Sequence, residues 1–357
     1  MLIFDAHLDL SLNAITYNRD LRQSVSDIRL LESGESQLAG WGKNTVAFPQ
    51  MREAGIGLCV ATQLAGCMKP AAAGGGWNSP EQARAMTQGQ LAWYRAMEEC
   101  GQLRQIRNLS DLDDHLQNWD AAPDSSPIGY ILSLEGADSL RTIDDLHRSY
   151  QDGLRALGPA HYGVGRYALG HDKDGPLTQP CRELLIEMDK LGIILDATHL
   201  CEQTFFDALD VFGGPVWASH HNCRAIVDNP RQLSDRQIKL LASRDAVIGV
   251  AFDIWMGVPN WERLVSNHET YADANMRALT NHVDHICQLI GNVNHIGIGT
   301  DLDGGFGTEQ TPSDLDTIAD LLTFVELLRQ KGYSESDLER ICHGNFLRVV
   351  RNAWKKT

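Results

Sequence analysis

The sequence has no long hydrophobic run and no cluster of basic residues. None of its segments approaches the ~18 consecutive apolar residues of a membrane-spanning helix, and the N-terminus lacks the basic and apolar regions of a secretion signal. Lys and Arg number 31 against 47 Asp and Glu, which gives a formal net charge of −16. So acidic a chain is a poor partner for polyanions. We therefore expect a soluble, cytoplasmic protein that binds neither nucleic acid nor membrane.

Regularly spaced cysteines are also missing. The eight cysteines are scattered, form no CxxC pair and mostly lie in apolar surroundings, as reduced thiols of a cytosolic protein do. The chain has 357 residues, of which 43% are hydrophobic, and this is enough for a sizeable core. Because an α/β barrel can hold about 250 residues or more in one domain, we predict a single catalytic domain over residues 1–357.

Short apolar runs bounded by turn signals recur along the chain, which is typical of fully buried parallel strands. Amphipathic segments with helical spacing lie between most of them, and Ser79 and Ser234 are suited to cap two of these helices. The predicted helices include residues 81–100, 181–192, 201–213, 234–245 and 274–291. The eight predicted strands are residues 2–7, 55–64, 128–136, 161–169, 192–199, 215–220, 246–253 and 295–301.

Eight strands that alternate with helices predict an α/β fold, a (β/α)8 TIM-like barrel. The alternative is a doubly wound open sheet, which would favour a glycine-rich phosphate loop after the first strand. That place holds FDAHLDLSLN (4–13), which contains no glycine. Longer loops follow the second and seventh predicted strands, at residues 71–80 and 254–270. Loops of this kind line the active-site end of a barrel.

Titratable side chains mark the carboxyl ends of the predicted strands. Because these ends meet at one mouth of a barrel, residues far apart in the chain become neighbours there. The set is His7 and Asp9 after strand 1, Glu135 after strand 3, His171 beyond strand 4, His199 after strand 5, His220 after strand 6 and Asp301 after strand 8. Imidazoles with carboxylates favour Zn²⁺, Mn²⁺ or Fe²⁺ over Ca²⁺ or Mg²⁺. The set is too large for one open tetrahedral zinc site and fits two metals bridged by a carboxylate.

Two metal ions about 3.5 Å apart can share a hydroxide nucleophile and polarise a carbonyl, so the set predicts hydrolysis at a carbonyl or phosphoryl centre. Each residue alone also has an ordinary structural explanation, as a packed, hydrogen-bonded histidine or as an aspartate that caps a helix. We assign that capping role to Asp196 and Asp253, and a supporting role to Asp5. The metal-site hypothesis rests on the number of such residues at the ends of separate strands.

Several motifs stand in order along the chain: DAHLD (5–9), SLEG (133–136), LGIILDATH (191–199), SHHN (219–222), DNPRQL (228–233), GIGTDLDG (297–304) and HGNFLRV (343–349). Together they resemble the membrane (renal) dipeptidase family of binuclear zinc peptidases, from Ile3 to Val350. The resemblance implies a metallo-dependent hydrolase barrel that cleaves a small dipeptide with two Zn²⁺ per subunit, often with tolerance of a C-terminal D-residue. It also implies a soluble prokaryotic member, for which a homodimer is compatible with the family.

The resemblance implies a role for each matched residue. His7 and Asp9 would bind one metal, His199 and His220 the other, with Glu135 between them; His171 would hold the substrate carbonyl oxygen, Arg231 the terminal carboxylate, and Asp301 the shuttled proton. A guanidinium can bind a carboxylate with two parallel hydrogen bonds, and a carboxylate can pass a proton to a leaving amine. The chain departs from the animal members after strand 7, where FDIWM (252–256) contains no tyrosine.

Two other functions fit parts of the pattern. An amidohydrolase acting on another N-acyl amino acid or a cyclic amide would usually begin with HxH and bridge its metals with a carbamylated lysine after strand 4. Here the first strand ends in HxD, and Lys173 lies in the polar loop DKDG (172–175). A non-catalytic metal-binding barrel would lack one or more ligands, whereas every matched ligand is present.

Overall fold

The computed structural model describes residues 1–67, 76–263 and 265–355, and within them eight parallel strands close into a barrel. The ring runs in chain order and closes where β1 pairs with β9 and β2 pairs with β4. Its strands are β1 (Ile3–Leu8), β2 (Ile56–Leu64), β4 (Ile128–Glu135), β5 (Leu154–Gly158), β6 (Ile194–Asp196), β7 (Val216–Ala218), β8 (Val247–Val250) and β9 (Ile296–Ile298). A further strand, β3 (Leu103–Gln105), pairs with the start of β4. The predicted (β/α)8 barrel is confirmed.

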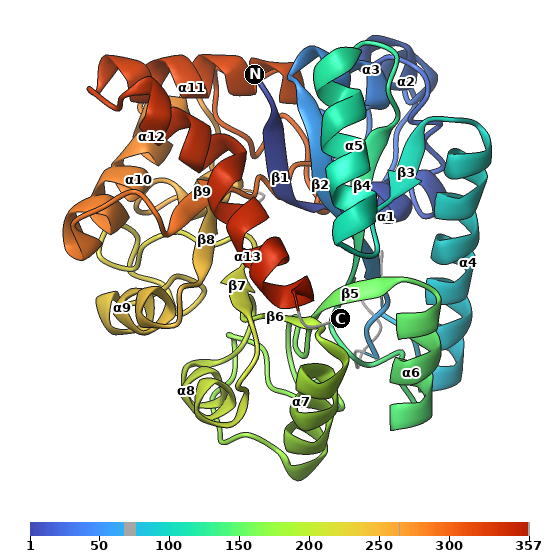
Figure 1. Cartoon of the computed structure of the whole chain (residues 1–357). Coiled ribbons are helices and arrows are strands. Elements are labelled where there is room, and N and C mark those ends of the chain that lie inside the picture. The colour runs from blue at the N-terminus through green and yellow to red at the C-terminus, as the bar shows by residue number, and fades with distance from the viewer. Residues whose placement is uncertain (68–75, 264, 356–357) are drawn as a thin grey trace.

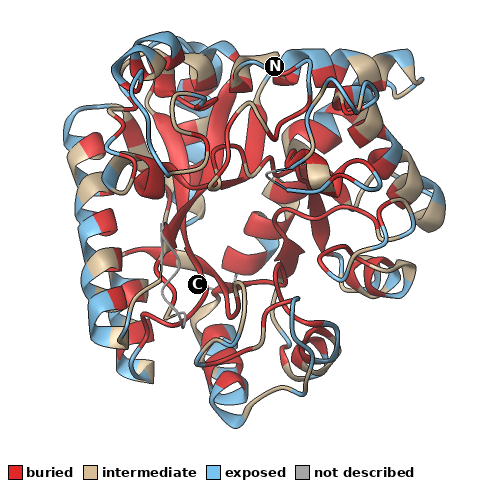
Figure 2. Cartoon of the chain, turned by 180° about the vertical axis from the view of Figure 1, so that it is seen from behind, coloured by how far each residue is buried: buried red, intermediate tan, exposed pale blue. Residues whose placement is uncertain are grey.

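Helices surround this barrel (Figure 1). The strands are the most deeply buried elements, and the surrounding helices turn exposed faces outward (Figure 2). The helices are α1 (Leu10–Ile15), α2 (Val25–Leu31), α3 (Phe48–Glu53), α4 (Pro80–Glu99), α5 (Leu109–Ala121), α6 (Ile143–Gln151), α7 (Gln179–Leu191), α8 (Glu202–Val211), α9 (Asp235–Ser243), α10 (Met276–Ile290), α11 (Leu321–Gln330), α12 (Glu335–Glu339) and α13 (Asn345–Trp354). Short turns η1 (Ile254–Met256), η2 (Ile318–Asp320) and η3 (Arg340–Gly344) complete the order.

The two predicted helix caps are present. The Ser79 hydroxyl accepts a hydrogen bond from the Gln82 amide at the start of α4, where Pro80 occupies the first turn. Ser234 and Gln237 form a reciprocal capping box at the start of α9. Such caps satisfy backbone N–H groups that have no partner inside the helix, and each typically stabilises a helix by about 1 kcal/mol.

The C-terminal helix α13 closes one end of the barrel (Figure 1). Phe346 packs against Phe4 at 5.5 Å and against Trp217 at 5.8 Å between ring centroids. Ile194 and Val247, the first residues of β6 and β8, belong to the same apolar cluster. The helix therefore covers the amino ends of the strands, and the opposite end carries the loops that follow their carboxyl ends.

One predicted strand was wrong. Residues 161–169 form a loop, and the fourth barrel strand is β5 at Leu154–Gly158. Arg155 interrupts the apolar pattern by which this strand could be recognised in the sequence. In the structure its guanidinium lies 4.1 Å from the Tyr150 ring centroid. In the loop, Val164 is 67% exposed, so its apolar residues do not mark a buried strand.

The two longer loops are only partly described. Residues 71–75 of the predicted loop 71–80, and residue 264 of the loop 254–270, lie outside the described residues. The second loop begins with the turn η1, and further along it the Trp261 side chain is buried. Among the described residues, no helix combines the length and apolar character needed to cross a bilayer.

Candidate metal centre

The five predicted metal ligands and Asp301, the predicted proton carrier, meet at the carboxyl ends of the barrel strands. His7 lies in β1, Asp9 follows it, Glu135 ends β4, and His199, His220 and Asp301 follow β6, β7 and β9. They form three overlapping groups, and within each group the potential ligand atoms lie within 4.8 Å of one another. The groups are His7, Asp9 and Glu135; Glu135, His199 and His220; and His7, His220 and Asp301. The loops thus bring together residues that are up to almost 300 positions apart in the chain.

Glu135 lies between two sets of imidazoles. Its Oε1 atom is 3.0 Å from Nε2 of His199 and 3.6 Å from Nε2 of His220. Its Oε2 atom is 3.6 Å from Nε2 of His7. A carboxylate with its two oxygens turned to different nitrogen donors has the arrangement of a bridging ligand between two cations.

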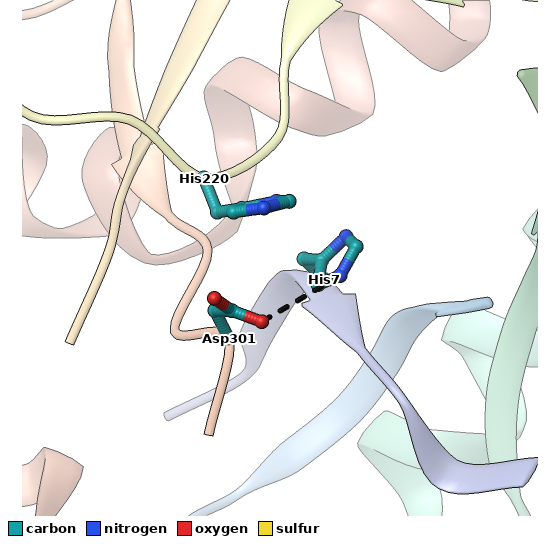
Figure 3. Close-up of side chains that lie close together, drawn as sticks. All are labelled: His7, His220 and Asp301. Carbon is teal, nitrogen blue, oxygen red and sulfur yellow. Dashed lines mark ion pairs between the residues drawn. The ribbon is translucent and has the colours of Figure 1, made fainter. Parts of the chain in front are cut away.

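In the third group, His7 lies beside His220 and Asp301 (Figure 3). Its Nε2 atom lies 3.7 Å from Oδ1 of Asp301 and 3.9 Å from Oδ1 of Asp9, and its ring centroid lies 3.8 Å from that of His220. Although His7 is buried, its Nε2 atom has no hydrogen-bond partner within the described part of the chain. A buried polar atom without a partner is costly, and a cation at this point would satisfy it. The donor set and this atom together fit a divalent metal.

Charge in the cluster favours the same conclusion. Burial alone would raise the pKa of Glu135, but the nearby His7 and His161 and the imidazole of His199 hold it well below the usual range. Burial opposes a charge on His7, yet Glu135, Asp9 and Asp301 together raise its pKa to about 10. A cluster of carboxylates that retains a proton on a buried imidazole is a site where a metal cation can take that proton's place.

The other two predicted histidine ligands stay neutral, as metal ligands must. Burial lowers the pKa of both His199 and His220 well below the usual range, and the positive charge of Arg231 lowers both further. The hydroxyl oxygen of Ser219 lies 2.9 Å from Nδ1 of His220. A hydrogen bond there leaves Nε2 of His220 as the lone-pair nitrogen that faces Glu135.

Two buried aspartates hold the strand ends that carry these ligands. Asp5 accepts hydrogen bonds from the Thr300 amide at 2.9 Å and hydroxyl at 2.6 Å, and thereby ties β1 to the segment after β9. Asp196 accepts from the amides of Thr198 at 3.0 Å and Ser219 at 3.1 Å. Asp5 therefore has the predicted supporting role. Asp196 does not cap the following helix, whose N-cap is Cys201, and it joins two strand ends instead.

The backbone is strained at two residues of the cluster. His199 and Asp301 adopt φ values of 67° and 59°, in the left-handed region that residues other than glycine rarely occupy. Such conformations cost roughly 1–3 kcal/mol and persist where the surrounding structure holds them. The strain turns both side chains out of the regular strand direction at the points where the cluster needs them.

Two histidines of the loop after β5 lie beside His199. His171, which was predicted as a site residue, places its Nδ1 atom 3.3 Å from Nδ1 of His199. His161 was missed, and its ring centroid lies 4.7 Å from that of His199. Burial lowers the pKa of both, to about 2 for His171. Placing the fourth strand at LRALG (154–158) would have identified His161 as the histidine that directly follows it.

Arg231 lies beneath the cluster and is almost fully buried. Its Nη2 atom donates to the His220 carbonyl oxygen at 3.1 Å, and its Nη1 atom lies 3.3 Å from Nδ1 of His221. Its Nε atom has no hydrogen-bond partner within the described residues. No carboxylate pairs with this guanidinium among the ion pairs of the described residues. It is therefore a buried cation with capacity for an anionic ligand.

Asp253 and Arg263, which we call the charged wall, lie within and after the segment FDIWM (252–256), which lacks the tyrosine of the animal family members. Asp253 is buried and accepts a hydrogen bond from Nε1 of Trp255 at 2.7 Å. The Nη2 atom of Arg263 lies 3.8 Å from Asp253, and its Nη1 atom lies 3.4 Å from the Tyr162 hydroxyl. Asp253 occupies the N-cap position of the turn η1, as predicted, but its side chain makes no capping hydrogen bond there. Asp253 lies near enough to the cluster to interact electrostatically with Asp301.

Comparison with known proteins supports the assignment. Residues 1–356 match the model of the family described as membrane dipeptidase, peptidase family M19. An uncharacterised dipeptidase of Schizosaccharomyces pombe is 27% identical over 235 residues, which are 64% of this chain and 53% of that protein. Dipeptidase 3 of Mus musculus is 27% identical over 274 residues, 74% of this chain and 52% of that protein. The matches thus span about half the length of these two relatives.

A solved structure shares the fold along the whole chain. The metallopeptidase of Rhodobacter sphaeroides, crystallised with a phosphinate mimic of the dipeptide L-Ala-D-Ala, superposes with a TM-score of 0.79 at 22% identity and covers 99% of each chain. The barrel, the cluster at its mouth and the match over residues 1–356 lead to one conclusion. The chain belongs to the membrane dipeptidase family, peptidase family M19.

Proposed function

We propose that this protein is a dipeptidase that hydrolyses the peptide bond of dipeptides at a pair of divalent metal ions, with Zn²⁺ as the first candidate and Mn²⁺ or Fe²⁺ as alternatives. The observation that carries the proposal is the position of Glu135, whose two oxygens face Nε2 of His199 and Nε2 of His7 at 3.0 and 3.6 Å. The family and the dipeptide mimic in the Rhodobacter structure support the substrate class.

In this proposal His7 and Asp9 hold one ion, His199 and His220 hold the other, and Glu135 contacts both. Ions bound there would lower the pKa of a water molecule and polarise a carbonyl group. The ligands would also keep the reacting bond at the barrel mouth, because every ligand stands at the carboxyl end of a strand.

Substrate orientation would rest on Arg231. Its guanidinium, unpaired by any carboxylate of the described residues, would bind the C-terminal carboxylate of the dipeptide. Asp301 would move the proton. Burial and the neighbouring carboxylates raise its pKa well above the usual value, so it can take a proton from the attacking water and return it to the leaving nitrogen.

The substrate carbonyl oxygen needs a donor. The family resemblance implied this role for His171, the histidine just beyond the predicted fourth strand. The strand ends at Gly158 instead, and His161 is the histidine nearest to that end. We therefore assign the carbonyl to His161, which lies against His199 and interacts electrostatically with Glu135.

The amidohydrolase alternative has no supporting feature at this site. The Lys173 side chain is half exposed and lies 3.8 Å from a carboxylate oxygen of Asp172. A carbamylated lysine would have to occupy the bridging place that Glu135 fills. A non-catalytic barrel is equally unsupported, because each of the predicted ligands is in the cluster.

The test is an assay of L-L and L-D dipeptides with metal content measured in parallel. We expect turnover that depends on bound metal, and the L-D series decides whether a C-terminal D-residue is accepted. Metal-replete protein that cleaves none of these dipeptides would refute the proposal. The same preparation, analysed by sedimentation, tests the predicted homodimer.

A further inference from the structure

His171 lies on the side of His199 that faces away from the metal cluster. Nε2 of His199 is turned to the cluster, 3.0 Å from Oε1 of Glu135 and 3.2 Å from Nε2 of His220. Nδ1 of His199 is turned the other way, 3.3 Å from Nδ1 of His171. The two ring nitrogens of His199 thus have different partners, Nε2 within the cluster and Nδ1 at His171.

This arrangement allows one proton distribution when Nε2 of His199 binds a cation. A ligand nitrogen offers its lone pair, so the ring proton of a neutral His199 must be on Nδ1. That N–H group needs an acceptor, and among the described residues its hydrogen-bond partner is Nδ1 of His171. A neutral His171 can accept at Nδ1 only when its own proton is on Nε2.

We propose that His171 is a positioning residue, which accepts the Nδ1–H hydrogen bond of His199 and so fixes the ring orientation and tautomer of that metal ligand. The inference rests on the proposed metal site. It replaces the substrate-binding role that the family resemblance implied for His171. Ser219 has the equivalent position at His220, with its hydroxyl 2.9 Å from Nδ1.

The backbone holds His171 in register with His199. Gly170 and Leu200, the neighbours of the two histidines, form an antiparallel bridge. The Cys201 amide donates to the Leu169 carbonyl oxygen at 3.1 Å on the same bridge. A contact that joins the two segments through the main chain keeps the imidazole pair aligned without a bound substrate.

Packing restricts the His171 ring further. The Tyr162 ring meets it edge to face, with centroids 4.7 Å apart. Gly170 lets the chain just before His171 lie close to the main chain of His161, because a Cβ atom there would lie 2.0 Å from the His161 carbonyl oxygen. The His171 side chain is therefore packed between Tyr162 and His199, and it is only 8% exposed.

Two substitutions separate a positioning role from simple packing. His171→Asn retains an acceptor oxygen near the place of Nδ1, whereas His171→Leu fills similar space without an acceptor. We expect His171→Leu to weaken metal binding by about 10- to 100-fold, as loss of such an outer hydrogen bond usually does. We expect His171→Asn to recover most of that affinity. Chelator competition on metal-loaded protein measures both, and it does not depend on turnover.

The outcomes distinguish the inference from the proposed function. Wild-type protein that binds no divalent ion would overturn both. Wild-type protein that binds metal, with His171→Leu binding it equally tightly or His171→Asn as weakly as His171→Leu, would overturn the positioning role alone. Unchanged metal affinity with a raised KM in His171→Leu would overturn the positioning role and support a substrate-binding role for His171.

A measurement on the unmodified protein covers the case in which His171→Leu does not fold. Histidine ¹⁵N–¹H spectra of zinc-loaded wild-type protein report which ring nitrogen carries the proton. We expect the His199 proton on Nδ1 and the His171 proton on Nε2. A His199 ring with its proton on Nε2, or a His171 ring with its proton on Nδ1, would overturn the inference.

Discussion

The carbonyl oxygen of Ser219 lies 1.7 Å from the position that a Cβ atom would take on Gly299. The same oxygen would lie 1.9 Å from a Cβ atom on Gly249. Gly249 in β8 and Gly299 directly after β9 thus leave room for the main chain that leads into the predicted ligand His220. Side chains at these positions would push that chain, and with it the metal cluster, out of place.

We expect Gly299→Ala to lower the free energy of unfolding by about 1–3 kcal/mol or more, as overpacking of a rigid core does, and to reduce metal content. Urea unfolding and metal analysis measure the two effects. Gly89→Ala is the matched control, because Gly89 lies exposed on α4 with open space around its Cβ position. That change is expected to stabilise the protein by about 0.4–1 kcal/mol. Equal stability of Gly299→Ala and wild type would contradict the crowding argument.

Glu135→Gln tests the bridging carboxylate. A neutral amide cannot supply two anionic oxygens, so we expect the variant to lose metal affinity by more than the about 10- to 100-fold that an outer hydrogen-bond partner is worth, and kcat to fall with it. Glu183→Gln, at an exposed position on α7, serves as the control. Full metal content and normal kcat in Glu135→Gln would exclude the bridge.

Arg231→Ala tests the carboxylate-binding role. A charge-assisted hydrogen bond is worth about 1.5–3 kcal/mol, so we expect KM for dipeptides with a free C-terminus to rise about 10- to 100-fold. The corresponding dipeptide amides lack the carboxylate and should respond much less. A variant with unchanged KM for both substrates would show that the anion binds elsewhere. Arg231→Lys should recover only part of the affinity, because lysine lacks the planar fork.

Asp253→Asn tests the charge state of the wall beside the cluster. Burial raises the pKa of Asp253 to about 6 from 3.8, against the opposing effect of Arg263. Between these values the folded protein keeps a proton that the unfolded chain releases, so this group lowers the free energy of unfolding as pH rises through the window. The loss is complete above about pH 6 and amounts to about 3 kcal/mol at 1.36 kcal/mol per pKa unit.

The asparagine variant cannot release a proton. Its stability relative to wild type should therefore grow from about pH 4 to about pH 6 and stay constant above. Urea unfolding of both proteins at matched metal content across this range measures the difference. Carboxylates that do not interact with Asp253 titrate alike in both proteins and cancel in the comparison, whereas Asp301 interacts with Asp253 and contributes to the difference. A difference that does not vary with pH would refute the assignment of the raised pKa.

The predictions from sequence succeeded where one geometric rule decides the outcome. The parallel strands of a barrel end at the same mouth. Residues at the ends of separate strands, such as Glu135 and His220, could therefore be grouped from the sequence alone. The fourth strand was misplaced because Arg155 interrupts its apolar pattern, and this error concealed His161. Hydrophobic pattern cannot reveal a charged side chain whose partners are carbonyl oxygens and an aromatic ring.

Other features depend on side-chain geometry that a pattern does not contain. Nothing in the sequence distinguishes Asp196, which joins two strand ends, from a helix cap. The spacing of His171 and His199 does not indicate which ring nitrogens meet. Such contacts follow from loop conformation and rotamers, including the left-handed backbone at His199, and these are set by the folded surroundings.

The position of α13 has a kinetic consequence. With Phe346 and its neighbours filling the amino end of the barrel, the described residues leave the cluster at the opposite end, and the two amino acids formed by the proposed dipeptide cleavage would leave on that side. A product bound to Arg231, as the proposed function has it, would therefore block the next dipeptide. Free amino acids should then inhibit competitively, and the amino acid that carries the former C-terminal carboxylate should be the stronger inhibitor of the two.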